Sequence, residues 1–350
     1  MKIVIDCRMT GSGGIGSYLQ ALLPFFLKDF ECLLIGTEKQ LSKFNESPAL
    51  KKLFCDIKPF SIKDSFLFPR NFLKTINTYD LYYSPYCNIP SGIRIPVVST
   101  IHDVVFLDIP ELAGSIGTFV RKIFYKRAVF KSKCIFTVSD FSKQRIESHL
   151  KPAKTPVIVT YNALPPWFSI PENKVEKENY ILFVGNIKKH KGLHTLLDAY
   201  KKIHEINSTL KLMIVGNSEN FRTNDQDITL KFNELKDSVS FTGFISDAEL
   251  KNIYCKAKLL IQPSLYEGFG MPPLEALSLG TNVILSDIPV FKEIYKDLPV
   301  NFFKTEDSSD LADKVINCLD LPEPEIINNP YSFERTYNII CESINHFNKG

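Results

Sequence analysis

The 350-residue sequence has no apolar run that approaches the length of about 20 residues needed for a membrane-spanning helix. Its short apolar start, residues 2–6, ends at the acidic Asp6, so we expect no secretory signal peptide. The net charge is only +3, which is too small to indicate a nucleic-acid-binding protein. We therefore expect no nucleic-acid partner. The expected location is the cytoplasm, and a peripheral association with the inner face of the membrane is the alternative.

Metal-binding and disulfide patterns are also lacking. The chain has eight cysteines, but no two of them have the C-x-x-C spacing, and most lie in apolar runs. Such positions are typical of buried, reduced thiols. The acidic pair of Asp225–Asp227 and the histidine pair of His190 and His194 resemble metal-binding spacings, but we interpret both as loop and helix polarity. We therefore expect no metal and no cofactor.

Apolar, β-branched runs alternate with segments of helical periodicity along the whole chain. Continuous apolar runs are typical of strands that are buried on both faces, as in parallel sheets covered by helices. Because the alternation occurs twice, we predict an α/β fold with two Rossmann-like parallel-sheet domains that face each other across a cleft. The predicted strands are 2–6, 32–36, 80–85, 96–103, 134–139, 156–162, 180–186, 210–216, 238–243, 258–264 and 282–287.

Two breaks in the alternation divide the chain. A stretch with three prolines and five charges, residues 163–179, has neither helical nor strand periodicity and is interpreted as a linker. After a second break at residues 320–332, helical periodicity resumes without a following strand. The predicted segments are an N-terminal domain at 1–165, a linker at 166–178, a C-terminal domain at 179–325, and a final helix at 330–350 that packs back on the N-terminal domain.

Gly11–Gly16 matches the pattern G-x-G-x-x-G between a predicted strand and a helix. This pattern is typical of dinucleotide-binding turns. However, Cys7–Thr10 separates the glycines from the strand, and only Glu38 loosely matches the expected acidic partner. An NAD-dependent oxidoreductase therefore remains the weaker alternative.

A cationic loop follows the predicted strand 180–186. Lys188, Lys189, His190 and Lys191 lie between this strand and a helix. Because the start of a helix favours anions, the added cations indicate a phosphate site. A solvated loop at the start of a surface helix is the alternative interpretation.

Two carboxylates follow the predicted strand 258–264. Glu267 comes directly after it, and Glu275 falls in the next helix, with seven residues between the two. Gly268 and Gly270 permit tight turns and a close approach to a ligand. Carboxylates so placed can accept pairs of hydroxyl hydrogen bonds, as from sugars, although Glu275 could instead cap or solvate its helix. In the first half, His102 ends the predicted strand 96–103, a position that is usually structural.

These motifs together resemble a known family. The segment 264–277, SLYEGFGMPPLEAL, resembles the E-x7-E signature of retaining, GT-B-fold glycosyltransferases of family 4 (glycosyl transferases group 1). Residues 184–200 resemble the phosphate-binding strand, loop and helix of that family. The segments 13–18, 101–103 and 137–144 resemble its N-terminal elements in the expected order. The resemblance covers nearly the whole chain and implies the GT-B fold.

The resemblance also implies roles for individual residues. Glu275 would bind the ribose hydroxyls of a nucleotide diphosphate-sugar, and Glu267 would hold hydroxyls of the transferred sugar. Lys191 would contact the diphosphate, and His102 would orient the donor sugar, so His102, Glu267 and Lys191 are the predicted catalytic residues. Many family members have Arg where Asn186 stands, and Lys188 or Lys189 could substitute for it. The predicted donor-binding residues are Gly13, Gly14, Asn186, Lys191, Gly243, Phe244, Glu267, Phe269, Gly270, Met271 and Glu275.

The implied activity is a retaining, metal-independent transfer of a hexose from a nucleotide diphosphate-sugar. GDP-mannose is favoured over a UDP-sugar as donor. The acceptor would be a saccharide or a lipid-linked saccharide in the synthesis of a surface polysaccharide of the O-antigen or lipopolysaccharide type. A sugar-nucleotide-binding protein, or an epimerase on the same fold, is the alternative to a transferase.

The segment 118–133 is strongly basic and contains no acidic residue. One interpretation is a helix that buries Phe119, Ile123, Phe124 and Val129 and turns its basic face to water. In the other, the basic residues meet an anionic phospholipid surface. The basic residues that would make this membrane contact are Arg121, Lys122, Lys126 and Arg127.

Overall fold

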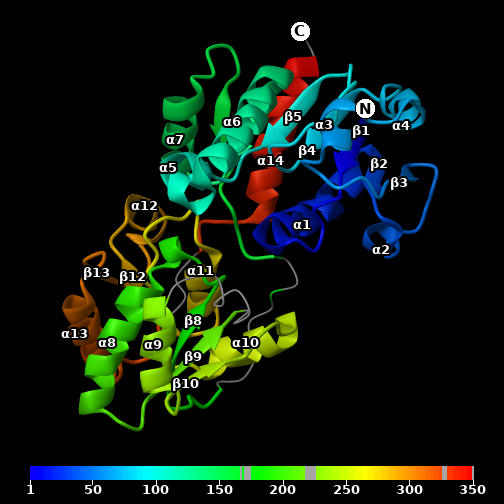
Figure 1. Cartoon of the computed structure of the whole chain (residues 1–350). Coiled ribbons are helices and arrows are strands. Elements are labelled where there is room, and N and C mark those ends of the chain that lie inside the picture. Colours follow the sequence, from blue (N-terminus) through cyan, green and yellow to red (C-terminus); the bar gives the residue numbers. More distant parts are fainter. Residues whose placement is uncertain (166–167, 169–174, 217–225, 325–328, 349–350) are drawn as a thin grey trace. The chain divides into compact units, whose positions relative to one another are not determined.

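The computed structural model describes residues 1–165, 168, 175–216, 226–324 and 329–348. The chain forms two compact units, Met1–Trp167 with Tyr331–Gly350, and Phe168–Pro330. Each unit contains one parallel sheet with helices packed on it (Figure 1). The predicted fold class, two parallel-sheet α/β domains, is thereby confirmed. The predicted linker lies largely outside the described residues, at 166–167 and 169–174.

The sheet of the first unit has seven strands in the order β3-β2-β1-β4-β5-β6-β7, and all its strand pairs are parallel. Its central strands β1, β4 and β5 are mostly apolar, and all their residues except Lys2 are buried. The strands are β1 (Lys2–Asp6), β2 (Glu31–Gly36), β3 (Leu50–Phe54), β4 (Leu81–Ser84), β5 (Val97–Thr100), β6 (Ser132–Thr137) and β7 (Val157–Val159).

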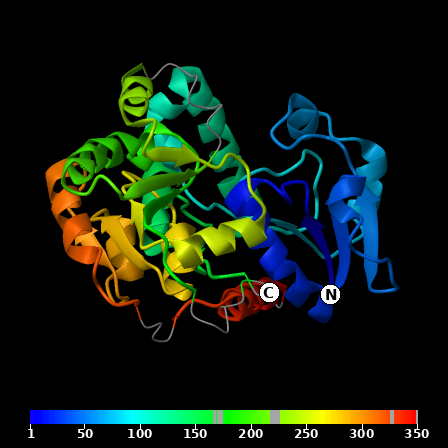
Figure 2. The ribbon, with the colours of Figure 1, turned by 90° about the horizontal axis from the view of Figure 1, so that it is seen from below.

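The helices of the first unit include the last helix of the chain, α14, which lies beside α1 (Figures 1 and 2). The Tyr337 hydroxyl on α14 donates a hydrogen bond to Asp29 on α1 at 2.6 Å. The helices are α1 (Gly13–Asp29), α2 (Glu38–Leu41), α3 (Ile62–Phe66), α4 (Arg70–Ile76), α5 (Val105–Asp108), the 3-10 helix η1 (Pro110–Leu112), α6 (Gly114–Lys131), α7 (Asp140–Leu150) and α14 (Phe333–Asn348). Within the described ranges, no helix combines the length and the apolar composition needed to cross a membrane.

The sheet of the second unit has six parallel strands in the order β10-β9-β8-β11-β12-β13. Its strands are β8 (Tyr180–Val184), β9 (Lys211–Val215), β10 (Val239–Phe241), β11 (Leu259–Gln262), β12 (Asn282–Ser286) and β13 (Asn301–Phe303). Its helices are the 3-10 helix η2 (Lys189–Lys191), α8 (Leu193–Ile206), α9 (Gln226–Leu235), α10 (Asp247–Lys256), α11 (Met271–Ser278), α12 (Pro289–Tyr295) and α13 (Ser308–Cys318).

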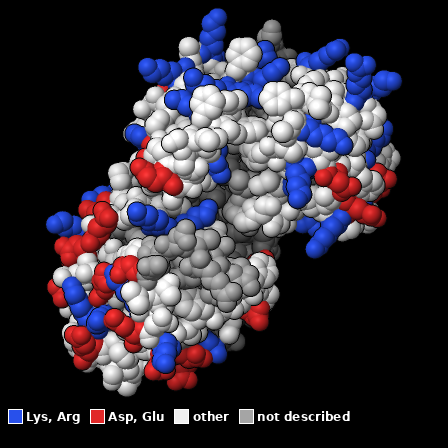
Figure 3. Space-filling model, in the orientation of Figure 1, with Lys and Arg blue, Asp and Glu red and all other residues white. Residues whose placement is uncertain are grey.

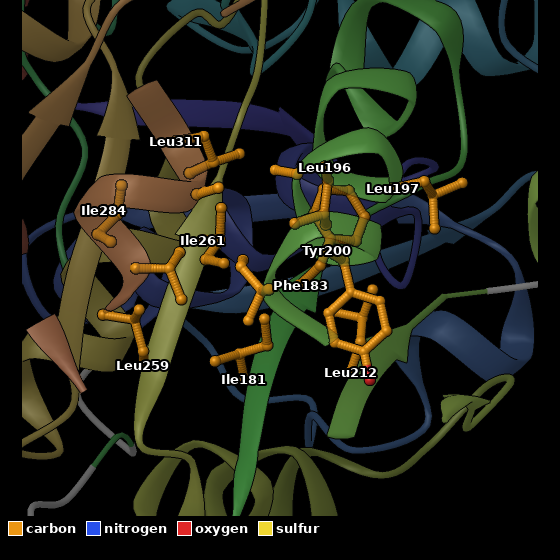
Figure 4. Close-up of a cluster of buried hydrophobic side chains, with 14 of the residues drawn as sticks. Ile181, Phe183, Leu196, Leu197, Tyr200, Leu212, Leu259, Ile261, Ile284 and Leu311 are labelled. Atoms are coloured by element: carbon orange, nitrogen blue, oxygen red, sulfur yellow. The ribbon is translucent and has the colours of Figure 1, made fainter. Parts of the chain in front are cut away.

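The core of the second unit forms where α8 packs on the sheet. Figure 4 shows Phe183 of β8 and Ile261 of β11 pointing toward Leu196 and Tyr200 of α8, and all four are buried. Helix α13 lies beside α8 (Figures 1 and 2), and the Lys202 ammonium group donates to the Ser309 hydroxyl at 2.6 Å. This packing fixes α8 on the sheet.

The sequence did not predict β3 and β13, which are edge strands of the two sheets. Strand β3 has the sequence LKKLF, with two lysines in place of a continuous apolar run, and its burial is only partial. Strand β13 has three residues. Edge strands are covered less completely than central ones, so their sequences carry a weaker apolar signal.

The prediction for the basic segment 118–133 is partly wrong. Helix α6 packs on the unit through Tyr125, Ala128 and Val129, which are buried. Phe119 and Ile123, predicted to be buried, are 65% and 48% exposed. The apolar residues of this helix outnumber those that its buried face can accommodate, so part of them faces solvent.

A buried ion network closes the carboxyl end of β1. The Arg8 guanidinium donates to Asp6 at 2.7 and 2.9 Å and to Asp64 at 2.6 Å. The three side chains are at most 1% exposed. Burial would raise the pKa of Asp6, but Arg8 and the hydroxyl of Tyr82 hold it below its ordinary value. Burial leaves the pKa of Asp64 raised in spite of Arg8. One guanidinium therefore pairs with two carboxylates that water cannot reach, and its single charge offsets only one of them.

We expect Arg8→Met to lower the free energy of unfolding by about 3–5 kcal/mol, because it leaves two buried carboxylates without their cation. Urea denaturation followed by circular dichroism measures this loss. Arg70→Met is the matched control, because Arg70 lies exposed at the start of α4. Equal effects of the two substitutions would contradict a stabilising role of the network.

Candidate functional site

A close backbone contact joins the two loops that follow β8 and β11. Gly192, between η2 and α8, has a φ angle of 69°, and a Cβ atom there would lie 1.8 Å from the carbonyl oxygen of Pro263. Beside it, the Leu265 backbone N–H donates to the carbonyl oxygen of His190 at 2.8 Å. Only glycine permits this approach. The cationic loop and the E-x7-E segment are thus fixed against each other.

Lys191 and Glu267 meet at this junction. The Lys191 Nζ lies 2.6 Å from Glu267 Oε1, and their side chains are only 18% and 12% exposed. The Ser264 hydroxyl donates to the same oxygen at 2.9 Å, and the Gln262 amide donates to Ser264 at 3.2 Å. Within the described residues, both hydrogen bonds to the Glu267 carboxylate fall on Oε1, so Oε2 remains able to accept a ligand hydroxyl. Ser264 and Gln262 therefore fix the Glu267 carboxylate, while its Oε2 is available to a ligand.

Glu275 is held by a buried tyrosine. Its Oε2 accepts a hydrogen bond from the Tyr254 hydroxyl on α10 at 2.7 Å. Burial raises the pKa of Glu275 in spite of this hydrogen bond. The sequence left open that Glu275 caps its helix. This interpretation is wrong, because α11 begins after Gly270 without a side-chain cap. Glu275 is a fixed polar group in an otherwise apolar helix.

The turn into α11 requires glycine at residue 270. Gly270 has a φ angle of 85°, and a Cβ atom there would lie 2.4 Å from the ring of Phe291. The Tyr295 hydroxyl donates to the carbonyl oxygen of Gly270. Phe269 is buried, and Met271 opens the helix. This turn fixes the course of the backbone between Glu267 and Glu275.

The remaining predicted residues of the second unit lie at its surface or behind the pair. Asn186, Lys188 and Lys189 are exposed after β8. His190 is buried, and burial together with Lys191 lowers its pKa to about 4, so its ring is neutral at pH 7. Gly243 has a φ angle of 71° with open space around it. Phe244 next to it is 99% exposed, an unusual position for a large apolar side chain.

Three predicted residues belong to the first unit. Gly13 and Gly14 begin α1, and nothing lies within 4 Å of where their Cβ atoms would be. His102 follows β5, and its Nε2 lies 3.0 Å from the carbonyl oxygen of Pro85. The partly buried ring packs edge-on against Tyr18 of α1 at 4.9 Å between centroids, and burial lowers the pKa of His102 to about 4. A neutral ring that donates from Nε2 carries an acceptor at Nδ1.

The sequence patterns that resembled metal sites have other partners. Asp227 pairs with Lys231 at 3.2 Å and with the Nδ1 of His194 at 3.1 Å, while Asp225 lies outside the described residues. Across the described segments, no three His, Cys, Asp or Glu side chains gather as a metal ion would need. The eight cysteines form no disulfide.

Sequence reasoning missed the residues that orient the two glutamates. Gln262 and Ser264 were signalled by polar letters at the end of an apolar strand, QPS, and could have been noted. Tyr254 carried no such signal, because a tyrosine inside a helix is more often a core residue. Its contact with Glu275 joins residues 21 positions apart and depends on how α10 packs beside α11.

Solved structures define the class of fold. The sucrose-phosphate synthase of Thermosynechococcus elongatus aligns with a TM-score of 0.68 at 16% identity, over 99% of this chain and 94% of that one. Anabaena Alr3699/HepE, solved in complex with UDP and glucose, aligns with a TM-score of 0.68 at 16% identity, over 99% and 95% of the two chains. The chain therefore has the two-domain GT-B fold of these glycosyltransferase structures.

Sequence comparison finds a family match in the second unit. Residues 168–329 match the family model Glycosyl transferases group 1. The O-antigen chain mannosyltransferase RfbU of Salmonella typhimurium is 32% identical over 228 residues, which are 64% of this chain and 61% of that protein. The O-antigen chain mannosyltransferase B of Escherichia coli is 25% identical over 232 residues, which are 62% and 59% of the two chains. The aligned part thus spans about 60% of the length of these curated relatives.

We expect Gly192→Ala to lower the free energy of unfolding by about 3 kcal/mol or more, because its Cβ atom would overlap the Pro263 carbonyl oxygen. Gly243→Ala is the matched control, with a similar φ angle and open space, and should lose about 1 kcal/mol. Chemical denaturation of both variants measures the difference. Equal losses would show that backbone conformation alone, and not the close contact, requires glycine at residue 192.

The lowered pKa of His102 makes the first unit less stable in acid. Between about pH 6.5 and pH 4 the unfolded chain binds a proton that the folded ring does not, so stability falls as the pH falls. From pH 7.5 to pH 5 this contribution is about 2 kcal/mol. We expect His102→Gln to lose about that much less stability over this range in urea denaturation. A pH dependence unchanged from that of the original chain would contradict the buried, neutral ring.

Proposed function

We propose that this chain is a glycosyltransferase that moves a hexose from a nucleotide diphosphate-sugar to a saccharide acceptor, with retention of the anomeric configuration and without a metal. The observation that carries the proposal is the partly buried pair of Lys191 and Glu267, which lies in the loops that follow β8 and β11. In open parallel sheets, ligands bind at these ends. The family match in the second unit and the names of the relatives support the same reaction class.

The diphosphate leaving group needs positive charge close to it. As the glycosidic bond breaks, negative charge accumulates on the diphosphate, and a preorganised cation stabilises it. Lys191 supplies that charge, with the backbone N–H groups at the start of α8 beside it. Lys188 or Lys189, both of them exposed, takes the place of the family's arginine at Asn186. Gly13 and Gly14, which open the first turn of α1, are the proposed backbone contacts of the diphosphate in the first unit.

The two glutamates have different tasks in this proposal. Glu275, held by Tyr254, accepts hydrogen bonds from the ribose hydroxyls, while Gly243 and Phe244 contact the base. Glu267 and the backbone of Phe269, Gly270 and Met271 hold hydroxyls of the transferred sugar. The Nδ1 of His102 accepts a hydrogen bond from the same sugar.

Glu267 is a positioning group in this mechanism and not a nucleophile. Its Oε1 is engaged by an ammonium and a hydroxyl group, and its Oε2 is assigned to a hydroxyl of the transferred sugar and not to the anomeric carbon. The acceptor hydroxyl approaches on the face that the diphosphate leaves, and the departing phosphate oxygen takes the acceptor proton. Retention then follows without a covalent sugar intermediate on the enzyme, in contrast to retaining hydrolases.

GDP-mannose is the proposed donor, because relatives in the same alignment are named O-antigen chain mannosyltransferases. A UDP-sugar is the second candidate, since the HepE structure of the same fold contains UDP and glucose. The proposed acceptor is a saccharide or a lipid-linked saccharide of a surface polysaccharide.

We expect Glu267→Ala to lower acceptor-dependent donor consumption at least about 100-fold, because the transferred sugar loses its positioning group. Binding of the nucleotide diphosphate should persist, as a shift of the melting temperature with GDP or UDP. Glu275→Ala should instead raise the Kd of the nucleotide by about 10- to 100-fold, through the lost charged hydrogen bonds.

Glu234→Ala is the control for both variants, because Glu234 is an exposed glutamate of α9 paired with Lys201. It should leave turnover and binding unchanged. Full turnover by Glu267→Ala would show that the assignment is wrong. A melting-temperature shift with NAD, and none with GDP or UDP, would favour the oxidoreductase instead.

A further inference from the structure

Helix α6 presents an apolar stripe to solvent. Ile116, Phe119, Val120 and Ile123 recur at the i, i+3, i+4 and i+7 spacing of one helix face, and all four are exposed. Ile116 is the most exposed of them, at 82%. An amphipathic helix of a soluble domain usually turns such a stripe toward the core, whereas α6 turns Tyr125, Ala128 and Val129 inward instead.

Helix α3 extends this surface. Phe66 at its end and Leu67 directly after it are both 70% exposed. The two helices are in contact, since the Arg127 guanidinium on α6 donates to the backbone oxygen of Ser65 on α3 at 2.8 Å. The α3–α6 surface is hereafter defined by its six exposed apolar residues, Phe66, Leu67, Ile116, Phe119, Val120 and Ile123.

Most charges around the α3–α6 surface are positive, and the exposed Glu111 of η1, near the start of α6, is an exception. Lys126 and Lys131 on α6 and Lys63 on α3 are exposed, and Lys122 is partly exposed. From residue 114 to residue 139 the sequence contains no acidic residue. The carboxylate of α3, Asp64, is buried against Arg8 and does not offset these charges. Figure 3 shows Lys and Arg side chains interspersed with uncharged residues over the region of α6.

The structure separates the arginines of α6 from its lysines. The Arg121 guanidinium stacks on the ring of Phe106 at 4.0 Å, and Arg127 bonds to α3. Both therefore hold the surface together. Lys122 and Lys126 have flexible stems that can follow a neighbouring anionic layer.

We propose that the α3–α6 surface binds an anionic phospholipid bilayer at its interface. Apolar side chains at helical spacing, flanked by lysines, match the composition of interfacial helices, which insert their apolar face at the headgroup level. The lysines then lie at the level of the anionic headgroups. A second copy of the chain is a poorer occupant, because a symmetric contact would bring two sets of lysines together. The proposal does not rest on the glycosyltransferase activity.

Vesicle flotation tests the proposal on the full chain without any nucleotide or sugar. We expect the chain to float with vesicles of phosphatidylglycerol and phosphatidylcholine at low salt, and to float much less with phosphatidylcholine alone. Raising the salt to about 0.5 M should weaken binding, because it screens the lysines. Failure to float with anionic vesicles at low salt would overturn the proposal.

Two double variants separate the apolar and the charged contributions. Phe119→Ser with Ile123→Ser should lower the partition coefficient about tenfold or more, because two apolar side chains no longer enter the interface. Ile206→Ser is its control, since Ile206 on α8 is 69% exposed but belongs to the second unit. Lys122→Gln with Lys126→Gln should lower anionic-vesicle binding about tenfold or more at low salt. Lys236→Gln with Lys296→Gln is its control, because both lysines are exposed residues of the second unit. This variant removes the same charge and should leave anionic-vesicle binding unchanged.

The variants change exposed or partly exposed residues, so their melting temperatures and their response to nucleotide should match those of the unchanged chain. Unaltered vesicle binding by Phe119→Ser with Ile123→Ser would overturn the proposal. Light scattering could instead show a concentration-dependent dimer that this variant abolishes. That result would also overturn the proposal, because the surface would then be an interface between copies of the chain. If the unchanged chain bound no nucleotide, the proposed function would be contradicted. The proposal of membrane binding would not be affected.

Discussion

The carbonyl oxygen of Pro263 occupies the space that a Cβ atom of residue 192 would need. Everything proposed for the second unit depends on this contact, because it holds the loop after β8 against the loop after β11. Lys191 and Glu267, which are 76 positions apart, consequently meet at 2.6 Å. The ammonium group pairs with the carboxylate, and in the proposed reaction the same ammonium contacts the diphosphate. The site is thus built from backbone proximity first and from side-chain charge second.

Both units concentrate polar groups where parallel strands end, but they use them differently. In the first unit, Arg8 is enclosed by Asp6 and Asp64 and cannot reach a ligand, so the network stabilises the unit. In the second unit, Glu267 is bonded on one oxygen and Glu275 is supported by Tyr254 from behind. The degree of enclosure separates a structural ion network from a binding site, since full burial permits only groups that satisfy each other.

Much of the fold was predictable from the pattern of apolar runs. The buried central strands, β1 and β8 among them, gave continuous runs that fixed their position and their parallel pairing. The edge strands β3 and β13 were not predicted, because the lysines of β3 and the short length of β13 weaken the apolar pattern. Helix α6 was misread in part, because periodicity shows that a helix has an apolar stripe and not which side of it the domain covers. Phe119 and Ile123 belong to an apolar stripe of α6, but the domain does not cover them.

The sequence by itself determined the two-fold repetition of strand and helix and the local chemistry of the E-x7-E segment, because both depend on neighbours along the chain. It also placed His102 and the glycines at strand and helix ends. Only the tertiary structure decided which atoms meet. The pairing of Lys191 with Glu267 and the support of Glu275 by Tyr254 join different segments through packing, and so does the exposure of the stripe on α6. Such contacts depend on the register and packing of whole elements, which single letters do not encode.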